Sequence, residues 1–235
     1  MIYSVHQPQY IPWLGYFHKI AESDIFVILD NVQYKQREFQ NRNKIRTKLG
    51  WIWLAVPVIT KGKRYQLIKD VRIDNSLDWR RRHKNSLKTW YGKAKYFDKY
   101  FAQLEQLYNN PRDRLCDLNI EIIKFLLSVL EIKSKIYLES SMNIETKSTK
   151  RIIEIGKTLK ADVYLSGAGG RDYLEENLFL DSGIKLEYQD FVHPQYTQLY
   201  SHNSQFIPFL SVIDLIFNHG KSSMDILMGR KYSDK

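Results

Sequence analysis

Two histidines lie near the start of the chain in a segment that two prolines must shape. The segment HQPQYIPWLGYFH begins at His6 and ends at His18, and Pro8 and Pro12 prevent an ordinary helix between them. Histidine changes its charge near neutral pH, so both are candidates for acid–base catalysis. The simpler interpretation is that the loop is only packed and that His18 lies on a helix surface. Other polar side chains of the loop could bind a substrate: Gln7, Gln9 and Tyr10.

A second polar cluster follows the apolar run DIFVILD. Asp30 could act as a general base or orient a histidine. Amide side chains downstream would bind hydroxyl groups, and cations among them would bind phosphate, with arginine able to do so through two parallel hydrogen bonds. The alternative is an ordinary polar loop of a basic protein. The amides are Gln33, Gln40, Asn41 and Asn43, and the cations are Arg42, Lys44 and Arg46.

A third cluster is rich in glycine and follows the expected strand 163–166. Its candidate ligands for an anion are Ser166, Gly167, Gly169 and Gly170, because a strand that runs into such a bend can present backbone N–H groups. The spacing is neither G-x-G-x-x-G nor that of a P-loop. Plain turn geometry explains the glycines equally well, and both interpretations stay open.

The fourth cluster lies near the end of the chain and contains His193, Asp214 and Asn218. The last two are four residues apart and share one helix face. A buried aspartate there needs a partner, for which His193 or His6 would serve, unless the carboxylate is structural or caps the helix. No metal-ligand spacing and no G-x-S-x-G elbow occurs, and Cys116 is expected in the core.

Hydrophobic periodicity places these clusters on an α/β fold. Strand, loop, helix and buried strand follow one another within the first thirty residues, which favours a parallel sheet. We expect one domain over residues 1–235, a Rossmann-like and mostly parallel sheet flanked by helices, with a helical insert around residues 79–130. Strands are expected at 1–6, 24–30, 51–59, 135–139, 163–166 and 184–191. Helices are expected at 13–21, 114–130, 149–160, 171–180 and 211–218, one or two at 79–108, and loops at 33–49 and 193–208.

Positive charge is concentrated in one part of the chain. The 235 residues carry a net charge of +10, yet residues 35–100 hold 19 Lys and Arg against 5 Asp and Glu, a net +14. The remainder carries 17 basic and 21 acidic residues, a net −4. Such a local field attracts an anionic partner, for example a nucleotide sugar, coenzyme A, nucleic acid or an acidic membrane surface, unless it is only a solvated face.

Cysteine content and hydropathy exclude several classes. One cysteine forms no internal disulfide and no thiolate zinc cage, and no apolar run reaches the roughly 20 residues that span a bilayer. The N-terminus lacks the basic start and apolar stretch of a secretory signal. A cytoplasmic globular protein is expected, and its oligomeric state is left open.

The clusters, in this order, resemble the WbqC-like protein family. The resemblance rests on HQPQYIPWLGYFHKI at 6–20, DNVQYKQREFQNRNKIRT at 30–47, WIWLAVPV at 51–58, ADVYLSGAGGRDYL at 161–174, YQDFVHPQY at 188–196 and FIPFLSVIDLIFNHG at 206–220. It implies a bacterial protein that acts in the biosynthesis of O-antigen or another surface polysaccharide (lipopolysaccharide). Asn31 stands where an acid would be usual after Asp30, which weakens any mechanism that needs paired carboxylates at this point.

A fainter resemblance concerns the opening alone. Strand, proline-shaped loop with histidine, helix and a D-x-F-V-I-L strand are similar to nucleotidyltransferases with a paired-histidine motif, the wider group of pantothenate synthetase. Here His6 and His18 are twelve apart and H-x-G-H is absent. The resemblance suggests an ATP-using nucleotidyltransferase or adenylate-forming ligase.

These features together favour a transferase that N-acylates or N-aminoacylates a nucleotide-linked amino sugar. In this hypothesis His6 is the base, Asp30 or Asp214 orients it, and the cofactor is unknown, with an acyl or aminoacyl donor or ATP as candidates. The partner would be a nucleotide sugar or another phosphorylated small molecule. A nucleic-acid-binding module over residues 35–100 is a weaker alternative, because most of the aromatic residues it would need lie in core-like patterns. These are Trp51, Trp53, Tyr65, Trp79, Trp90 and Tyr91.

Overall fold

Each of the two units into which the chain divides is built from three separate segments. A computed structural model describes residues 1–201 and 205–231. The first unit, called the sheet unit here, contains Met1–Pro8, Gly15–Val32 and Ile132–Val192. The second, called the helical unit, contains Gln9–Leu14, Gln33–Glu131 and the chain from His193 onward. Short segments of the N-terminal region therefore contribute to both units.

Five strands form the sheet of the sheet unit, and every neighbouring pair is parallel. Their order, β5-β2-β1-β6-β7, places the first strand in the middle. The inner strand β2 is buried at every position, whereas the edge strands β5 and β7 are partly exposed, as expected for a sheet covered on both faces. The α/β fold expected from the sequence is confirmed. The strands are β1 (Ile2–His6), β2 (Ile25–Ile28), β5 (Lys135–Leu138), β6 (Val163–Ser166) and β7 (Lys185–Tyr188).

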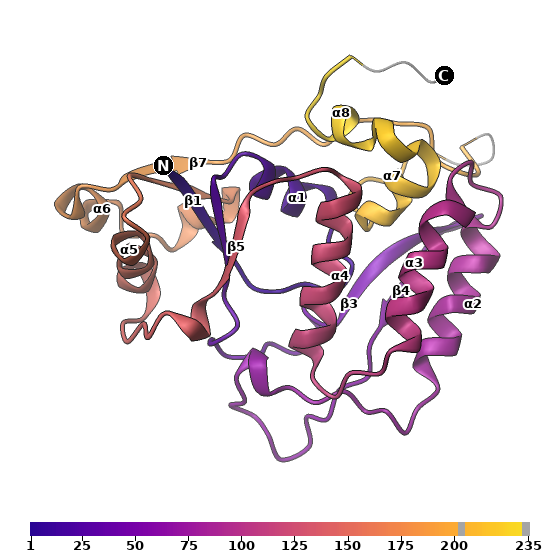
Figure 1. Cartoon of the computed structure of the whole chain (residues 1–235), viewed down its shortest axis with the longest axis horizontal. Coiled ribbons are helices and arrows are strands. Elements are labelled where there is room, and N and C mark those ends of the chain that lie inside the picture. Colours follow the sequence, from indigo (N-terminus) through magenta and orange to yellow (C-terminus); the bar gives the residue numbers. More distant parts are fainter. Residues whose placement is uncertain (202–204, 232–235) are drawn as a thin grey trace. The chain divides into compact units, whose positions relative to one another are not determined.

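Helices α1 (Leu14–Ala21), α5 (Ser148–Leu159) and α6 (Glu176–Ser182) alternate with these strands along the chain, and α5 and α6 lie side by side (Figure 1). Helix α5 packs closely on the sheet, because a Cβ on Gly156 would lie 2.5 Å from the Tyr3 hydroxyl oxygen. That hydroxyl donates a hydrogen bond to the Ile152 carbonyl at 2.8 Å. A glycine is required at position 156 for this approach.

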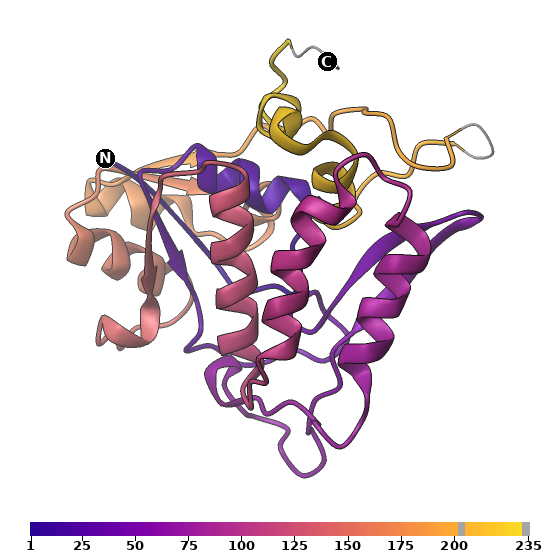
Figure 2. The same cartoon turned by 45° about the vertical axis from the view of Figure 1, so that its right-hand side comes forward.

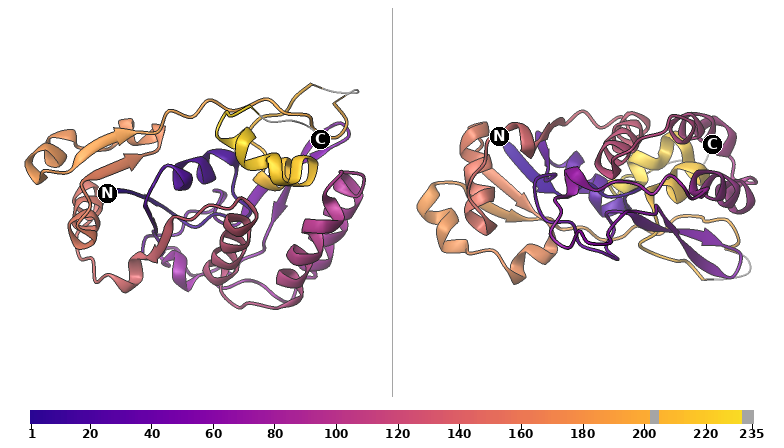
Figure 3. Two further views of the ribbon diagram at one scale, coloured as in Figure 1. Left: turned by 45° about the horizontal axis from the view of Figure 1, so that its top comes forward. Right: turned by 90° about the horizontal axis from the view of Figure 1, so that it is seen from below.

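The helical unit contains a hairpin and several helices. Strands β3 (Arg42–Thr47) and β4 (Gly50–Ala55) pair antiparallel and form a long ribbon (Figure 2). Helices α2 (Trp79–Tyr91), α3 (Phe97–Asn109) and α4 (Leu115–Val129) lie side by side, which confirms the helical insert. Helices α7 (Val212–His219) and α8 (Ser223–Leu227) follow later in the chain (Figure 3).

The core of the helical unit is largely aromatic. The rings of Phe97 and Phe101 stack with their centroids 4.6 Å apart, and Phe217 of α7 meets Phe97 edge to face at 5.1 Å. Trp79 and Tyr91 are buried as well, whereas Trp51 is 43% exposed and Tyr65 is 74% exposed. Cys116 is buried, as expected from its place in an apolar helix pattern.

The expectation of a loop over residues 33–49 was wrong for its second half, which forms β3. Polar residues of this strand lie on both of its faces. Asn43 is buried and bonded to backbone, whereas Lys44 covers an exposed tryptophan ring. Because polar residues occupy both faces of β3, apolar and polar residues do not alternate along it. The sequence therefore lacks the pattern that indicates a strand.

The helix expected at 171–180 is divided in the structure. A 3₁₀ turn, η3 (Ala168–Asp172), comes first, and α6 begins only at Glu176. The backbone N–H of Glu175 donates to the Thr149 hydroxyl at 3.2 Å, which holds the chain in a non-helical conformation between them. The helix expected to be the last, at 211–218, is followed by α8. The expected loop 193–208 holds no helix or strand in its described part, and residues 202–204 lie outside that part.

Candidate functional site

A polar side chain lies at the carboxyl end of every strand of the parallel sheet or within two residues after it. His6 ends β1, Ser166 ends β6, and Gln189 follows β7 directly. Asp30 comes two residues after β2, and Glu139 follows β5 directly. In open parallel sheets, ligands bind outside the carboxyl ends of the strands where the connections change direction. In this sheet that point lies between β1 and β6.

Strands β1 and β6 separate toward this edge. They pair only at Ile2 with Val163 and at Tyr3 with Tyr164, whereas β1 stays paired with β2 as far as His6. The carbonyl of Val5 accepts a hydrogen bond from the Lys19 ammonium at 3.0 Å. The Lys19 side chain therefore bonds to a β1 carbonyl that lies beyond the last residue pair between β1 and β6.

His6 is partly buried at the end of β1, and its ring meets that of Tyr16 edge to face. Its Nδ1 lies 3.1 Å from the Gln7 carbonyl, not on Asp30 or Asp214. A carbonyl only accepts, so Nδ1 carries the proton and Nε2 of the neutral ring keeps its lone pair. Burial, together with the positive charge of Lys19, lowers the pKa of His6 to about 3, although the hydrogen bond to Gln7 opposes this.

Lys19 was not singled out from the sequence. Its side chain is 3% exposed, and burial lowers its pKa to about 7. Among residues 1–201 and 205–231, no carboxylate forms an ion pair with it. No signal in the sequence indicates its burial, which comes from the packing of a helix whose residues from Leu14 to Ile20 are all buried.

The glycine turn after β6 passes the same ammonium. A Cβ on Gly167 would lie 3.8 Å from Nζ of Lys19, whereas a Cβ on Gly169 would meet nothing within 4 Å. Gly170 packs tightly, since its Cβ would lie 2.0 Å from Oγ of Ser166, which donates to the Gly167 carbonyl at 3.0 Å. Four of the residues expected to bind an anion thus form one turn beside Lys19.

Two carboxylates meet between β2 and β5, although they are far apart in sequence. Asp30 is buried and accepts from the backbone N–H and the hydroxyl of Ser140 at 2.9 and 2.5 Å. Glu139 is 1% exposed and pairs through Oε1 with Arg151 at 2.8 Å. Within the described residues, its buried Oε2 has no hydrogen-bond partner. Burial raises the pKa of Glu139, with Arg151 opposing and Asp30 adding to the rise.

The second histidine of the opening segment has different neighbours. His18 is buried on α1, with Nδ1 2.9 Å from the Gln189 amide nitrogen and 3.3 Å from the Glu22 carboxylate. Its ring packs against that of Phe191. Burial lowers the pKa of His18, and the charge of Asp190 opposes this. His18 thus belongs to the sheet unit, as does His6, but each is held by its own set of contacts.

The other candidate residues belong to the helical unit, where many of their polar atoms are bonded to the protein itself. Asn43 donates to the Ile11 carbonyl at 2.9 Å, and Gln40 accepts from the backbone N–H of Lys35 at 3.1 Å. The Arg46 guanidinium, which is fully buried, donates to the carbonyls of Leu199 and Gln205 at 3.2 and 3.0 Å. These bonds hold loops and strands together.

Asp214 is the centre of a buried network. Its carboxylate accepts from the hydroxyls of Tyr91 and Tyr196, both at 2.9 Å, and from the Gln198 amide at 3.0 Å. Burial raises its pKa, and these hydrogen bonds and the charge of Arg46 oppose the rise. The side chain of Asn218 donates to the backbone carbonyl of Asp214 at 2.7 Å.

His193 also uses both ring nitrogens within the helical unit. Nδ1 lies 2.9 Å from the Pro194 carbonyl, and Nε2 accepts from the backbone N–H of Phe209 at 3.1 Å. Tyr10 bonds through its hydroxyl to His83 and Tyr108 inside the unit. Two further candidates also donate to backbone carbonyls, Asn41 to that of Val56 and Gln33 to that of Arg64. Gln9 differs, because its buried Oε1 has no hydrogen-bond partner within the described residues.

Two predicted cations lie on the outer face of the β3–β4 hairpin. The Arg42 guanidinium is 4.3 Å from the ring centre of Trp53, and the Lys44 ammonium is 4.4 Å from that of Trp51. Cations in this position are attracted by the aromatic ring. Trp51 is exposed, so this face is open to an anionic or planar partner.

Sequence comparison relates this chain to a known protein family. A model of the WbqC-like protein family matches residues 7–226, nearly the whole chain. The chain belongs to the WbqC-like protein family. An uncharacterized protein of Mycobacterium tuberculosis (strain ATCC 25618 / H37Rv) is 32% identical to this WbqC-like protein over 226 residues, which cover 95% of this chain and 96% of the relative. No solved structure matches it.

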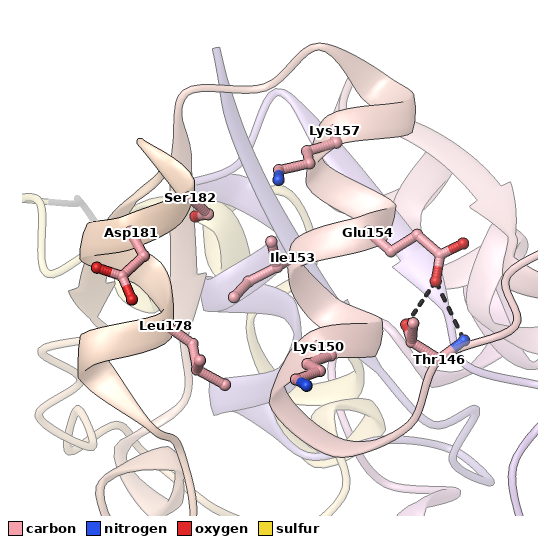
Figure 4. Close-up of a pocket in the computed structure, with 8 residues that line it drawn as sticks. All are labelled: Thr146, Lys150, Ile153, Glu154, Lys157, Leu178, Asp181 and Ser182. Atoms are coloured by element: carbon pink, nitrogen blue, oxygen red, sulfur yellow. Dashed lines mark hydrogen bonds between the residues drawn. The ribbon is translucent and has the colours of Figure 1, made fainter.

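A pocket of about 350 Å³ in this WbqC-like protein lies between α5 and α6 of the sheet unit (Figure 4). Ile153 and Leu178 contribute apolar side chains, and Glu154 turns toward Thr146, to which it is hydrogen-bonded. None of its lining residues is among those singled out at the carboxyl edge. The chemistry at the edge and the pocket are therefore separate features.

Residues 1–201 and 205–231 of the WbqC-like chain hold neither a metal-ligand cluster nor a membrane-spanning helix. In that part, no group of three His, Cys, Asp or Glu side chains is placed to hold a metal ion. No helix in it has the length and apolar character needed to cross a membrane.

Proposed function

We propose that this WbqC-like protein is an enzyme of bacterial surface-polysaccharide (O-antigen) biosynthesis that transfers an acyl or aminoacyl group to the amine of a nucleotide-linked amino sugar. The observation that carries this proposal is His6 at the carboxyl end of the central strand, with its Nδ1 proton on the Gln7 carbonyl and its Nε2 lone pair available. A base with a fixed tautomer at a ligand-binding edge suits the removal of a proton from an amine.

The reaction needs one proton transfer in each direction. The amine nitrogen attacks the carbonyl carbon of the donor, the N–C bond forms, and the bond from that carbon to the leaving group breaks. His6 takes the amine proton on Nε2 and returns it to the leaving group. Gln7 acts as the positioning residue through its carbonyl. Asp30, held by Ser140, and Glu139 lie at the same edge and are proposed to bind substrate hydroxyls.

The low pKa of His6 sets a condition on this mechanism. At neutral pH the free ring is neutral, so Nε2 can accept, but the charge of Lys19 opposes formation of an imidazolium. An anionic group near Lys19 would offset that charge and make His6 a stronger base. The proposed nucleotide-linked substrate carries such a group. Arg42 and Lys44 on the β3–β4 hairpin are proposed as a separate anion-binding surface of the helical unit, and Arg46 is assigned to holding the fold.

The test is direct product detection. Purified protein is incubated with nucleotide-activated amino sugars and a panel of acyl and aminoacyl donors, with and without ATP, and products are measured by mass spectrometry. We expect a mass increment on one sugar and a loss of rate of about 10²–10⁴-fold in His6→Ala, partly restored by added imidazole. Gln7→Ala, which keeps the backbone carbonyl, should lose far less. A complete donor panel with no increment on any sugar excludes acyl transfer.

A second candidate is an ATP-using nucleotidyltransferase or adenylate-forming ligase. It is favoured by the strand order, which places His6 and the glycine turn at the point where parallel sheets bind nucleotides. Pyrophosphate released only when a carboxylate and ATP are both present would support this candidate over simple acyl transfer.

A further inference from the structure

Lys19 is a buried cation whose charge is not balanced by the protein around it. Its side chain is 3% exposed, and its ammonium has three N–H donors, of which one is bonded to the Val5 carbonyl. In the described residues no carboxylate pairs with it. Buried charges are normally paired, because an uncompensated ion loses several kcal/mol of hydration.

The place of this ammonium in the sheet is informative. Strands β1 and β6 have already separated where Val5 lies, so its carbonyl is free to accept from a side chain. On the other side, Gly167 presents no Cβ, and one placed there would lie 3.8 Å from Nζ. The ammonium is thus located between the central strand and a turn that lacks side chains at positions 167 and 169.

We propose that Lys19 is the binding residue for a phosphate or diphosphate group, held between the end of β1 and the glycine turn after β6. An oxyanion there would supply the missing negative charge, and the glycines leave room for its oxygens and for backbone contact. This proposal rests on the proposed function in one respect, which is that ligands bind at the carboxyl edge of the sheet. A phosphate site at Lys19 is compatible with acyl transfer and with nucleotidyl transfer.

Binding of simple phosphates tests this site directly. Isothermal titration with pyrophosphate, inorganic phosphate, a nucleoside diphosphate and acetate is carried out on the full chain. Wild type is compared with Lys19→Met, with Gly167→Ala, and with Lys157→Met, which removes an exposed lysine from the same unit. We expect pyrophosphate and the diphosphate to bind, with affinity at least tenfold lower in Lys19→Met, several-fold lower in Gly167→Ala and unchanged in Lys157→Met.

Thermal unfolding of each variant keeps the result interpretable. Lys19→Met should melt no lower than wild type, so a loss of binding cannot be ascribed to unfolding. Equal pyrophosphate affinity in wild type and Lys19→Met would overturn the proposal, and so would binding of acetate without pyrophosphate. A Lys19-dependent phosphate site without acyl transfer would leave the site standing and reject the reaction. Acyl transfer in which Lys19→Met leaves the KM for the nucleotide sugar unchanged would support the reaction and reject the phosphate site.

Discussion

Two buried cations of this protein have opposite surroundings. Arg46 of the helical unit donates to two backbone carbonyls and lies near Asp214, which itself accepts from two tyrosines and an amide. Lys19 of the sheet unit donates to one carbonyl and has no carboxylate partner in the described chain. The first network is complete and stabilises a fold. The second lacks a negative charge, which we expect a ligand to provide.

Removal of the Arg46 charge should have the largest effect. Arg46→Met leaves Asp214 without its nearby cation and the carbonyls of Leu199 and Gln205 without donors. The loss of a buried charge near Asp214 together with two hydrogen-bond donors should cost about 3–5 kcal/mol of unfolding free energy. Urea unfolding measures the loss. A change below about 1 kcal/mol would mean that the Arg46 network does not stabilise the fold, which would contradict the contrast drawn between Arg46 and Lys19.

Lys19→Met should change stability in the opposite direction. A buried charge without a partner loses several kcal/mol of hydration, so we expect an apolar side chain of similar size to be neutral or stabilising by about 1–4 kcal/mol. The lowered pKa gives the pH dependence. In the folded state Lys19 loses its proton near pH 7, but the unfolded chain keeps it to about pH 10, so wild-type stability rises between these values.

The advantage of Lys19→Met should therefore be greatest below pH 7 and shrink as the pH rises. Urea unfolding at pH 6 and pH 9 measures this difference, with Lys157→Met as the matched control. A variant that is several kcal/mol less stable than wild type at pH 6 would show that Lys19 is a structural residue.

A smaller effect is expected from Gly170→Ala. The new Cβ would lie 2.0 Å from Oγ of Ser166 and 2.9 Å from Cδ1 of Leu174, so the turn must shift. Overpacking of this kind costs about 1–3 kcal/mol. The double variant Gly170→Ala/Ser166→Ala should recover part of the stability in thermal unfolding, since it removes the closest atom. No recovery would indicate that the Ser166 hydroxyl is not what limits the turn.

The sequence was sufficient to predict the elements whose residues are buried in a regular period. The apolar run around Ile25–Ile28 and the helix at Leu115–Val129 are examples. Strand β3 was missed because its burial depends on partners elsewhere: Asn43 bonds to carbonyls of residues 10 and 11, and Lys44 lies over Trp51.

The site was predictable only in part, for a related reason. His6 and the glycines at 167–170 stand at strand ends, and the order of elements along the chain indicates those positions. Glu139 is brought beside Asp30 only by the pairing of β2 with β5, which join segments more than a hundred residues apart. Asn31 therefore does not preclude a pair of carboxylates. The burial of Lys19 and its lack of a carboxylate partner among the described residues depend on tertiary packing, which the sequence does not reveal.

The pKa of the Lys19 ammonium tests the central claim most directly. It can be followed by NMR of labelled lysine side chains, with Lys19→Met to assign the signal, in the absence and presence of saturating pyrophosphate. We expect a pKa near 7 in the free protein, in which the neighbouring His6 ring is neutral at that pH, and a rise of at least about one unit when pyrophosphate is bound. A pKa that stays the same on adding pyrophosphate would contradict the account.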